Sequence, residues 1–163
     1  MKVKRINRVV IVVGNLDEAM AMYTKILDAT FTISPKEFEQ VGRIRYALSF
    51  DAGLELIQLL DGEPERSSDP NEHAMLQWLR NDGYRWLKQR GEGIAGVVFD
   101  IDDVEESRQA AESLGIGIPY TFEFSEQELA FFGISQYTKY LEYYADPDKA
   151  NNTMTLLSEF VER

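Results

Sequence analysis

The stretch from Lys4 to Leu27 joins an apolar run, a tight turn and an amphipathic pattern. Residues Ile6–Val13 are mostly β-branched, which suits a buried strand. Asn15 follows the strand and stands three residues before Glu18, the spacing of a capped helix start. Apolar residues then recur on one helical face, at Leu16, Ala19, Met20, Tyr23, Ile26 and Leu27. The stretch therefore predicts a strand, a turn and a helix.

The same pattern returns near residue 96. The run Gly96–Ile101 reads as a second apolar strand, and Asp103 stands three residues before Glu106, which repeats the capping spacing. Apolar and small residues mark a helix face at Val104, Ser107, Ala111 and Leu114. Aligning Leu16 with Val104 places Arg8 opposite Gly96. The chain is therefore predicted to contain two copies of one unit.

Three further strands are expected in each copy, which gives the order β-α-β-β-β twice. They are predicted at 29–34, 43–50 and 54–60 in the first copy, and at 117–124, 137–144 and 153–161 in the second. Residues 1–60 form the first module, residues 61–93 a helical connector and residues 94–163 the second module, within one pseudo-duplicated domain. Asn81–Gly83 is expected to split the connector helix in two, and Glu126–Phe132 to form a short helical insertion.

Composition narrows the functional classes. The 163-residue chain is 44% hydrophobic and carries a net charge of −11, which argues against nucleic-acid binding. It contains no cysteine, so disulfides and thiol chemistry are excluded. No segment approaches the roughly 20 apolar residues of a membrane span. We expect a soluble, cytoplasmic protein with no membrane partner.

Two segments resemble the vicinal oxygen chelate superfamily, which includes glyoxalases, bleomycin-resistance proteins and extradiol dioxygenases. They are RVVIVVGNLDEAMAMYTKIL and KQRGEGIAGVVFDIDDVEES, of which the second is most similar to the methylmalonyl-CoA epimerase branch. The resemblance implies an α+β fold in which two βαβββ modules form curled sheets around a cleft. It also implies a divalent metal held in that cleft by four side chains.

The four metal-ligand positions implied by the resemblance fall on Arg8, Glu55, Gly96 and Glu159. Two of them keep a carboxylate, whereas a guanidinium cannot ligate a metal and glycine has no side chain. We therefore expect a degenerate metal site and no cofactor. Arg8 is predicted to pair with Glu55, with Glu159 or with both, as a fixed positive charge in place of the ion. Alternatives are a purely structural ion pair, or a divalent metal held by the two carboxylates and water.

Other residues are candidates for ligand binding. Asp100 is expected on the cleft side of its strand, although it also fits a solvated strand end. Arg43 and Arg45 share a strand face and are candidates for binding a carboxylate or phosphate ligand, although both also fit an exposed edge. Aromatic residues are concentrated late in the chain, and Phe122, Phe131 and Tyr140 are predicted to line the cleft. The insertion carrying Phe131 and Phe132 is expected to be a lid or a subunit interface, and we predict a homodimer.

Three functions are compatible with these residues. The first is a binding protein that holds a small organic molecule in an aromatic-lined cleft. The second is an isomerase or lyase of glyoxalase or epimerase type, in which Glu55 or Glu159 acts as base beside a carbonyl and Arg8 or a metal stabilises the enolate. The third is an interaction subunit whose cleft is vestigial.

Overall fold

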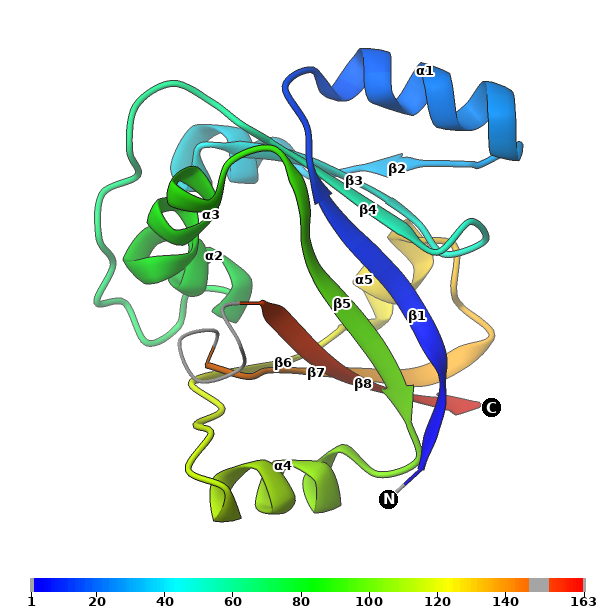
Figure 1. Ribbon diagram of the computed structural model, residues 1–163, viewed down its shortest axis with the longest axis vertical. Helices are drawn as coiled ribbons and strands as arrows, with labels where there is room; N and C mark the ends of the chain where they lie inside the picture. The colour runs from blue at the N-terminus through cyan, green and yellow to red at the C-terminus, as the bar shows by residue number, and fades with distance from the viewer. Residues whose placement is uncertain (1, 147–152, 163) are drawn as a thin grey trace. The chain divides into compact units, whose positions relative to one another are not determined.

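The computed structural model describes residues 2–146 and 153–162 (Figure 1). The chain divides into two compact units. Residues 9–95 form the N-terminal unit, and residues 1–8 together with 96–163 form the C-terminal unit. Strands β1 (Val3–Val12) and β5 (Gly93–Ile101) each contribute residues to both units.

The N-terminal unit contains four strands in the order β2-β3-β4-β1. These are β2 (Thr32–Ile33), β3 (Ile44–Ser49), β4 (Leu54–Leu59) and the end of β1. β4 runs parallel to β1 and antiparallel to β3. Helix α1 (Leu16–Leu27) covers one face of β3 and β4, and its Leu16 packs in the core with Ala47 and Leu56. The predicted cap is confirmed, because Glu18 N donates to Asn15 Oδ1 at 3.1 Å.

The connector contains two short α-helices joined by a π-helical turn. α2 (Ala74–Trp78), the π-helical turn η2 (Leu79–Gly83) and α3 (Tyr84–Arg90) follow one another without a break. The interruption expected at Asn81–Gly83 is confirmed as this π-helical turn, and Gly83 also serves packing. A Cβ at Gly83 would lie 2.6 Å from the Trp78 ring. A second π-helical turn, η1 (Phe38–Gly42), precedes β3.

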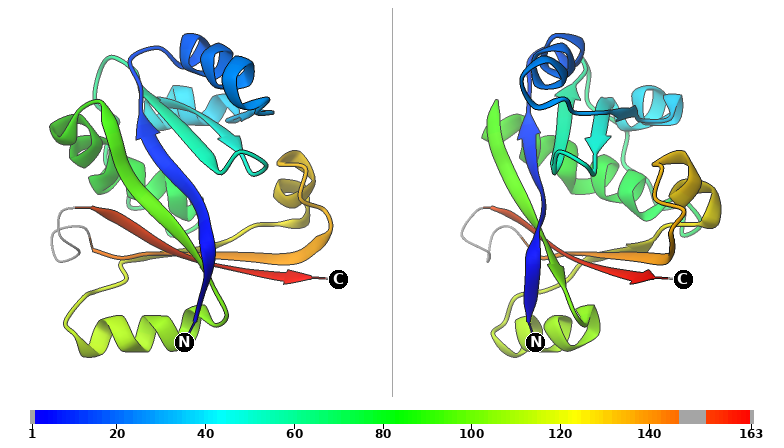
Figure 2. Two further views of the ribbon diagram at one scale, coloured as in Figure 1. Left: turned by 45° about the vertical axis from the view of Figure 1, so that its right-hand side comes forward. Right: turned by 90° about the vertical axis from the view of Figure 1, so that its right-hand side faces the viewer.

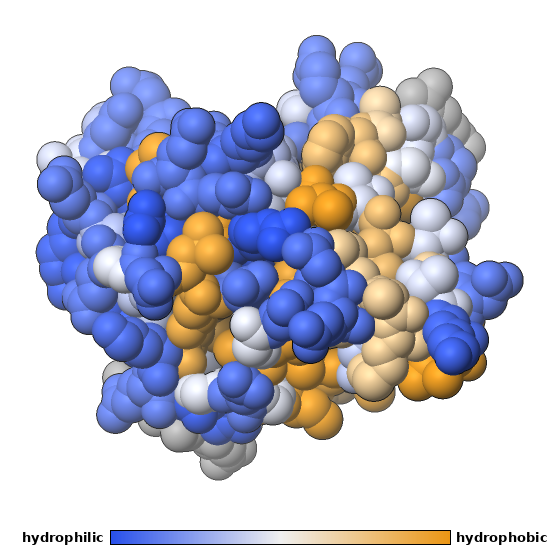
Figure 3. All heavy atoms as spheres, turned by 90° about the horizontal axis from the view of Figure 1, so that it is seen from above, coloured by the Kyte–Doolittle hydropathy of each residue, from blue (hydrophilic) through white to orange (hydrophobic). Residues whose placement is uncertain are grey.

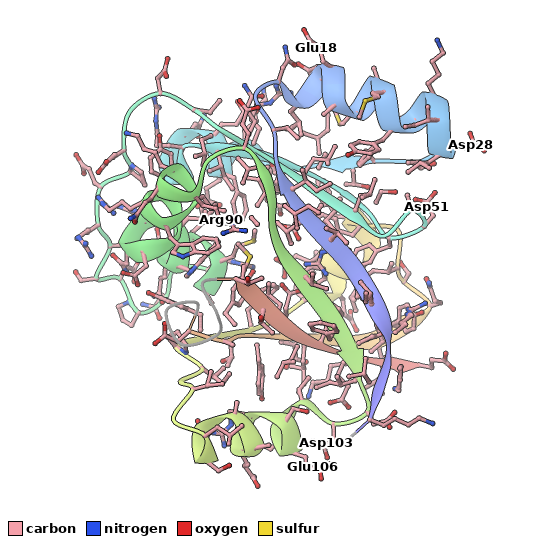
Figure 4. All side chains as sticks on the ribbon, viewed as in Figure 1. Glu18, Asp28, Asp51, Arg90, Asp103 and Glu106 are labelled. Atoms are coloured by element: carbon pink, nitrogen blue, oxygen red, sulfur yellow. The ribbon has the colours of Figure 1, made fainter. Side chains whose placement is uncertain are left out.

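The C-terminal unit contains β5, β8 (Met154–Glu162), β7 (Tyr137–Tyr144) and β6 (Tyr120–Glu123), in that order beside β1. β5 runs parallel to β8, and β7 runs antiparallel to β8 and β6. Helices α4 (Val104–Ser113) and α5 (Glu126–Phe131) lie on opposite sides of these strands (Figure 2). The predicted caps form here too: Glu106 N donates to Asp103 Oδ1 (Figure 4), and Ser125 forms a capping box with Glu128.

The two repeats predicted from the sequence are confirmed. Each has a strand, a helix and three more strands, and in each the last strand runs parallel to the first. Val9 lies opposite Leu54 in one repeat, and Val97 lies opposite Thr155 in the other. The main departure is β2, which spans two residues instead of the expected six.

The surface seen from above is mainly hydrophilic, with hydrophobic side chains gathered in patches (Figure 3). Helix α1 exposes Met22, Ile26 and Leu27 in the N-terminal unit. Exposed apolar groups of this kind are compatible with a subunit interface, and the homodimer stays a prediction. Within the described ranges, no helix is both long enough and apolar enough to cross a membrane.

Gly96 provides a test of the β5–β8 packing. A Cβ at this position would lie 2.3 Å from Met154 O and 2.5 Å from Met154 Cβ. We expect Gly96→Ala to lower the free energy of unfolding by about 1–3 kcal/mol, because the two strands must separate to admit the methyl group. Gly117→Ala is the matched control, since no atom lies within 4 Å of a Cβ there. Equal urea midpoints for the two variants would contradict this packing.

Candidate functional site

Arg8 is the buried cation of the C-terminal unit. Its side chain is 2% exposed, and its position near the end of the unit's β1 segment places it beside the residues of β7. Nη1 donates to Asn7 Oδ1 at 3.0 Å and to Tyr140 Oη at 2.7 Å. Nη2 donates to Glu142 Oε2 at 2.9 Å. The guanidinium therefore holds an amide, a phenol and a carboxylate in one cluster.

Glu142 is the carboxylate of this cluster, and its side chain is fully buried. Its Oε2 accepts hydrogen bonds from both Arg8 and Tyr140. Its Oε1 is also buried but has no hydrogen-bond partner among the described residues. A buried carboxylate oxygen without a donor is unfavourable and is uncommon in folded proteins. Glu142 thus presents an acceptor that the surrounding side chains leave unused.

Tyr140 links Arg8 to Glu142. Its hydroxyl accepts a hydrogen bond from Arg8 and donates one to Glu142 Oε2. Complete burial raises the pKa of Tyr140 well above its ordinary value of 10.0; the negative charge of Glu142 also raises it, and the positive charge of Arg8 opposes the rise. The phenol therefore stays protonated at neutral pH and acts as a hydrogen-bond donor to the carboxylate.

Asp100 is buried on β5 and has partners of its own. It lies opposite Ser158, which lies opposite Glu142, so the three polar side chains form a row across β5, β8 and β7. Ser158 Oγ donates to Asp100 Oδ1 at 3.3 Å, and Arg5 Nε donates to Oδ2 at 3.0 Å. The hydrogen bond from Arg5 to Asp100 raises the pKa of Arg5. Asp100 is thus neutralised within the unit.

Glu159 does not pair with Arg8, contrary to that part of the prediction. Its Oε2 accepts a hydrogen bond from Val104 N, at the start of α4, at 3.1 Å. Successive strand residues point to opposite faces, so the pairing of Glu142 with Ser158 places Glu159 on the other face. The strand pairing shows why Glu159 does not correspond to Glu55 in the second repeat. Val10 and Val98 occupy equivalent positions in the two repeats; Glu55 lies opposite Val10, whereas Leu156 lies opposite Val98.

The residues of the C-terminal unit do not fit the divalent metal that the resemblance implies. Arg8 cannot ligate, and Gly96 packs so closely on Met154 that a histidine does not fit there without separating β5 from β8. Among the described residues, no three His, Asp or Glu side chains are grouped so that they could hold a metal ion.

Two predicted site residues lie in the N-terminal unit. Glu55 is buried on β4, with 4% of its surface exposed. Arg45 is already engaged by carboxylates, since its guanidinium donates to both Asp17 oxygens and lies 3.3 Å from Glu39. Its hydrogen bond lowers the pKa of Asp17. These partners leave Arg45 better suited to holding α1 and η1 against β3 than to binding an acidic ligand.

The predicted aromatic residues separate into buried and exposed groups. Tyr140 is fully buried, and Phe122 is nearly so, with its ring centroid 5.5 Å from that of Phe124. Phe132 stacks on Phe124 at 5.2 Å, so part of the α5 insertion belongs to the core of this unit. Phe131 is 47% exposed, and its ring packs edge-on against that of Phe132, with the centroids 5.1 Å apart. These rings are brought together, although their role in binding a ligand stays a prediction.

Glu142, Asn7 and Ser158 were missed by the sequence analysis. A signal for Glu142 is present in the alternation of Tyr137–Tyr144, which places Tyr140, Glu142 and Tyr144 on one face. A glutamate between two tyrosines on a buried face requires a partner cation, and Arg8 is the buried cation among the described residues of this unit. Asn7 carries no comparable signal, because its hydrogen bond with Arg8 depends on the side-chain conformation of Arg8.

The chain matches a known protein family over most of its length. Residues 5–149 match the model of the Glyoxalase/Bleomycin resistance protein/Dioxygenase superfamily. No curated protein sequence matches the chain.

Solved structures also resemble the chain. A Mycobacterium tuberculosis methylmalonyl-CoA epimerase is 17% identical, with a TM-score of 0.56 over 96% of this chain and 88% of that one. A variant of the Streptomyces coelicolor methylmalonyl-CoA epimerase in complex with 2-nitronate-propionyl-CoA is 17% identical, with a TM-score of 0.57 over 99% of each chain. A hypothetical protein from Bacillus halodurans is 13% identical, with a TM-score of 0.54 over 98% of this chain and 96% of that one. At these identities the likeness concerns the fold.

Replacing Arg8 tests whether the cluster is a buried ion pair. We expect Arg8→Met to lower the free energy of unfolding by about 3–5 kcal/mol, because Glu142 would stay buried without its cation. Arg45→Met is the matched control. It removes an arginine paired with the largely exposed Asp17 and should cost about 1 kcal/mol or less. Urea denaturation measures both variants, and similar small losses would contradict a desolvated pair.

Tyr140 predicts a dependence of stability on alkaline pH. The pKa of Tyr140 is higher in the folded state than in the unfolded state. Between these two pKa values only the unfolded state releases the proton, which favours unfolding. The stabilising contribution of Tyr140 is therefore present below its unfolded-state pKa of 10.0 and is lost as the pH rises toward the folded-state value. Tyr140→Phe lacks this titration. We therefore expect the stability difference between wild type and Tyr140→Phe to shrink between pH 9 and pH 11. A difference that stays constant over this range would contradict the raised pKa.

Proposed function

The chain belongs to the Glyoxalase/Bleomycin resistance protein/Dioxygenase superfamily, and on that premise we propose that it binds a small organic molecule without a metal ion. The observation that carries this proposal is the buried guanidinium of Arg8, held by Tyr140 and Glu142 in the C-terminal unit. A buried fixed cation supplies positive charge at a sequence position where metal-dependent members carry a ligand.

The Arg8 cluster is better suited to binding a small molecule than to holding a metal ion. Hydrogen bonds from Arg8 to three acceptors fix the guanidinium plane, so its field is oriented before any ligand arrives. The aromatic side chains beside it, Phe124 and Phe160, have ring centroids 4.7 Å and 4.6 Å from that of Tyr140. Aromatic surface next to a few fixed polar groups is typical of small-molecule sites.

Elemental analysis and ligand binding together test this proposal. We expect purified protein to contain well below one equivalent of manganese, iron, cobalt, nickel or zinc per chain. After treatment with EDTA, a thermal-shift screen of organic acids and thioesters, with methylmalonyl-CoA and coenzyme A among the probes, should include compounds that raise Tm. The shift should be lost in Tyr140→Phe, which removes one hydroxyl, and kept in Tyr23→Phe, which makes the same change on α1.

Two results would overturn this reading. One is a stoichiometric metal that survives dialysis and is released by Glu55→Gln. The other is stabilisation by the probes only after a divalent metal has been added. Either result would show that the protein is one of the metal-dependent members of the superfamily.

A second candidate is an isomerase or lyase that moves a proton beside a carbonyl. The observation that favours it is Glu142 Oε1, a buried carboxylate oxygen with no partner among the described residues. Such an oxygen can accept a proton, and an adjacent guanidinium can stabilise the enolate that forms. The structural likeness to methylmalonyl-CoA epimerases supports testing a thioester first.

Deuterium exchange separates the two candidates. Methylmalonyl-CoA is incubated with the EDTA-treated protein in D2O, and loss of the α-proton is followed by NMR against a protein-free sample. Binding alone predicts no exchange above that background. Enzyme-dependent exchange that is abolished in Glu142→Gln would favour the isomerase, whereas exchange that persists in Glu142→Gln but not in Glu55→Gln would assign the base to Glu55.

A further inference from the structure

A pocket of about 390 Å3 lies in the N-terminal unit, and its lining contains no residue of the Arg8 cluster. It is bordered by η1 on one side and by residues 61–66, here called the 61–66 loop, on the other. Arg43 and Arg80 contribute to its lining together with Glu63 and Glu65. Pockets of this size accommodate small organic ligands. Two arginines in one pocket are notable in a chain with a net charge of −11.

Arg43 occupies an unusual backbone position. It ends η1 in the left-handed region, with φ 57° and ψ 34°, and its N–H donates to Phe38 O. Glycine is the residue best suited to this position, because a Cβ is strained there. Strained residues of this kind gather at functional sites. An arginine at this position is therefore expected to have a structural or functional role that offsets the backbone strain.

One role of the Arg43 side chain is to hold the 61–66 loop in place. Nε and Nη2 of Arg43 both donate to Asp61 O. Nε of Arg80 donates to Glu65 O at 2.8 Å, from the other end of the loop. Each guanidinium is thus fixed along one edge by a main-chain carbonyl. Among the described residues, Nη1 of Arg43 has no hydrogen-bond partner, so bracing the loop uses only part of its donor capacity.

The charges around the pocket leave Arg43 uncompensated. Arg80 is paired with Glu72, which does not line the pocket. Glu63 is matched by Arg85 Nε at 3.2 Å and by Lys88 Nζ at 3.7 Å. Arg43 has no carboxylate within ion-pair distance in the described part of the chain. Glu65 is exposed and is the one lining carboxylate that opposes an anion.

We propose that this pocket binds a small oxyanion, a phosphate or a carboxylate, through the guanidinium groups of Arg43 and Arg80. A planar guanidinium fixed along one edge presents its remaining donors in a set direction, which suits paired oxygen acceptors. This site is independent of the proposed binding at Arg8, and neither depends on the other.

The test is a titration of the ¹⁵N-labelled full chain with inorganic phosphate and, separately, with succinate. Sodium chloride keeps the ionic strength constant. We expect saturable shifts of amide signals that are confined to residues such as Gln40, Arg43 and Gly62 with at least one of the two anions. The anion that binds more tightly identifies the ligand class. Absence of a saturable shift with both anions would overturn the proposal.

Three variants make the test specific. Arg43→Gly removes the guanidinium, suits the left-handed backbone and should weaken binding about tenfold or more. Arg66→Gln removes the same charge from the same loop outside the pocket lining, and should change affinity less than about twofold. Glu65→Gln should tighten binding by removing the opposing charge. Equal losses in Arg43→Gly and Arg66→Gln would show general charge screening and overturn the proposal.

Discussion

The ion pair between Arg8 and Glu142 is the constraint on which the C-terminal unit depends. Both charges are withdrawn from water, which is costly unless each is fully hydrogen-bonded. Arg8 donates to Asn7, Tyr140 and Glu142, and these hydrogen bonds join the β1 segment of this unit to β7. Glu142 Oε1 is the carboxylate oxygen of the pair that has no partner among the described residues. The aromatic residues around Tyr140 then exclude water from the pair. The polar cluster and its apolar surroundings are therefore one structural element.

The same pair explains how this chain differs from the metal-dependent pattern that its sequence resembles. Carboxylates that share a site repel one another when no cation lies between them, whereas an arginine supplies a cation that cannot dissociate. At Gly96, β5 and β8 approach so closely that no ligand side chain fits. The guanidinium of Arg8 and the packing at Gly96 are therefore both unfavourable for a metal ligand at these two positions.

The repeats, their caps and the significance of Arg8 could be predicted from the sequence, because they depend on local spacing and on a shared motif. The partner of Arg8 could not. Glu159 and Glu142 are both glutamates in late strands, and only the β7–β8 register shows which one faces Arg8. A shift of a single residue exchanges the two faces of a strand. The packing of Gly83 against Trp78 could not be predicted for a related reason, since it depends on where the Trp78 ring lies.

The division of β1 between the two units has a consequence for the order of folding during synthesis. The first eight residues belong with residues 96–163, so they leave the ribosome long before the strands on which they pack. Arg8 and Glu142 are 134 residues apart. Contacts this distant in sequence form late, because a long loop must close before they form. Asn7 and Arg8 therefore stay solvated while residues 9–95 are completed, and they become buried only after β7 has been made.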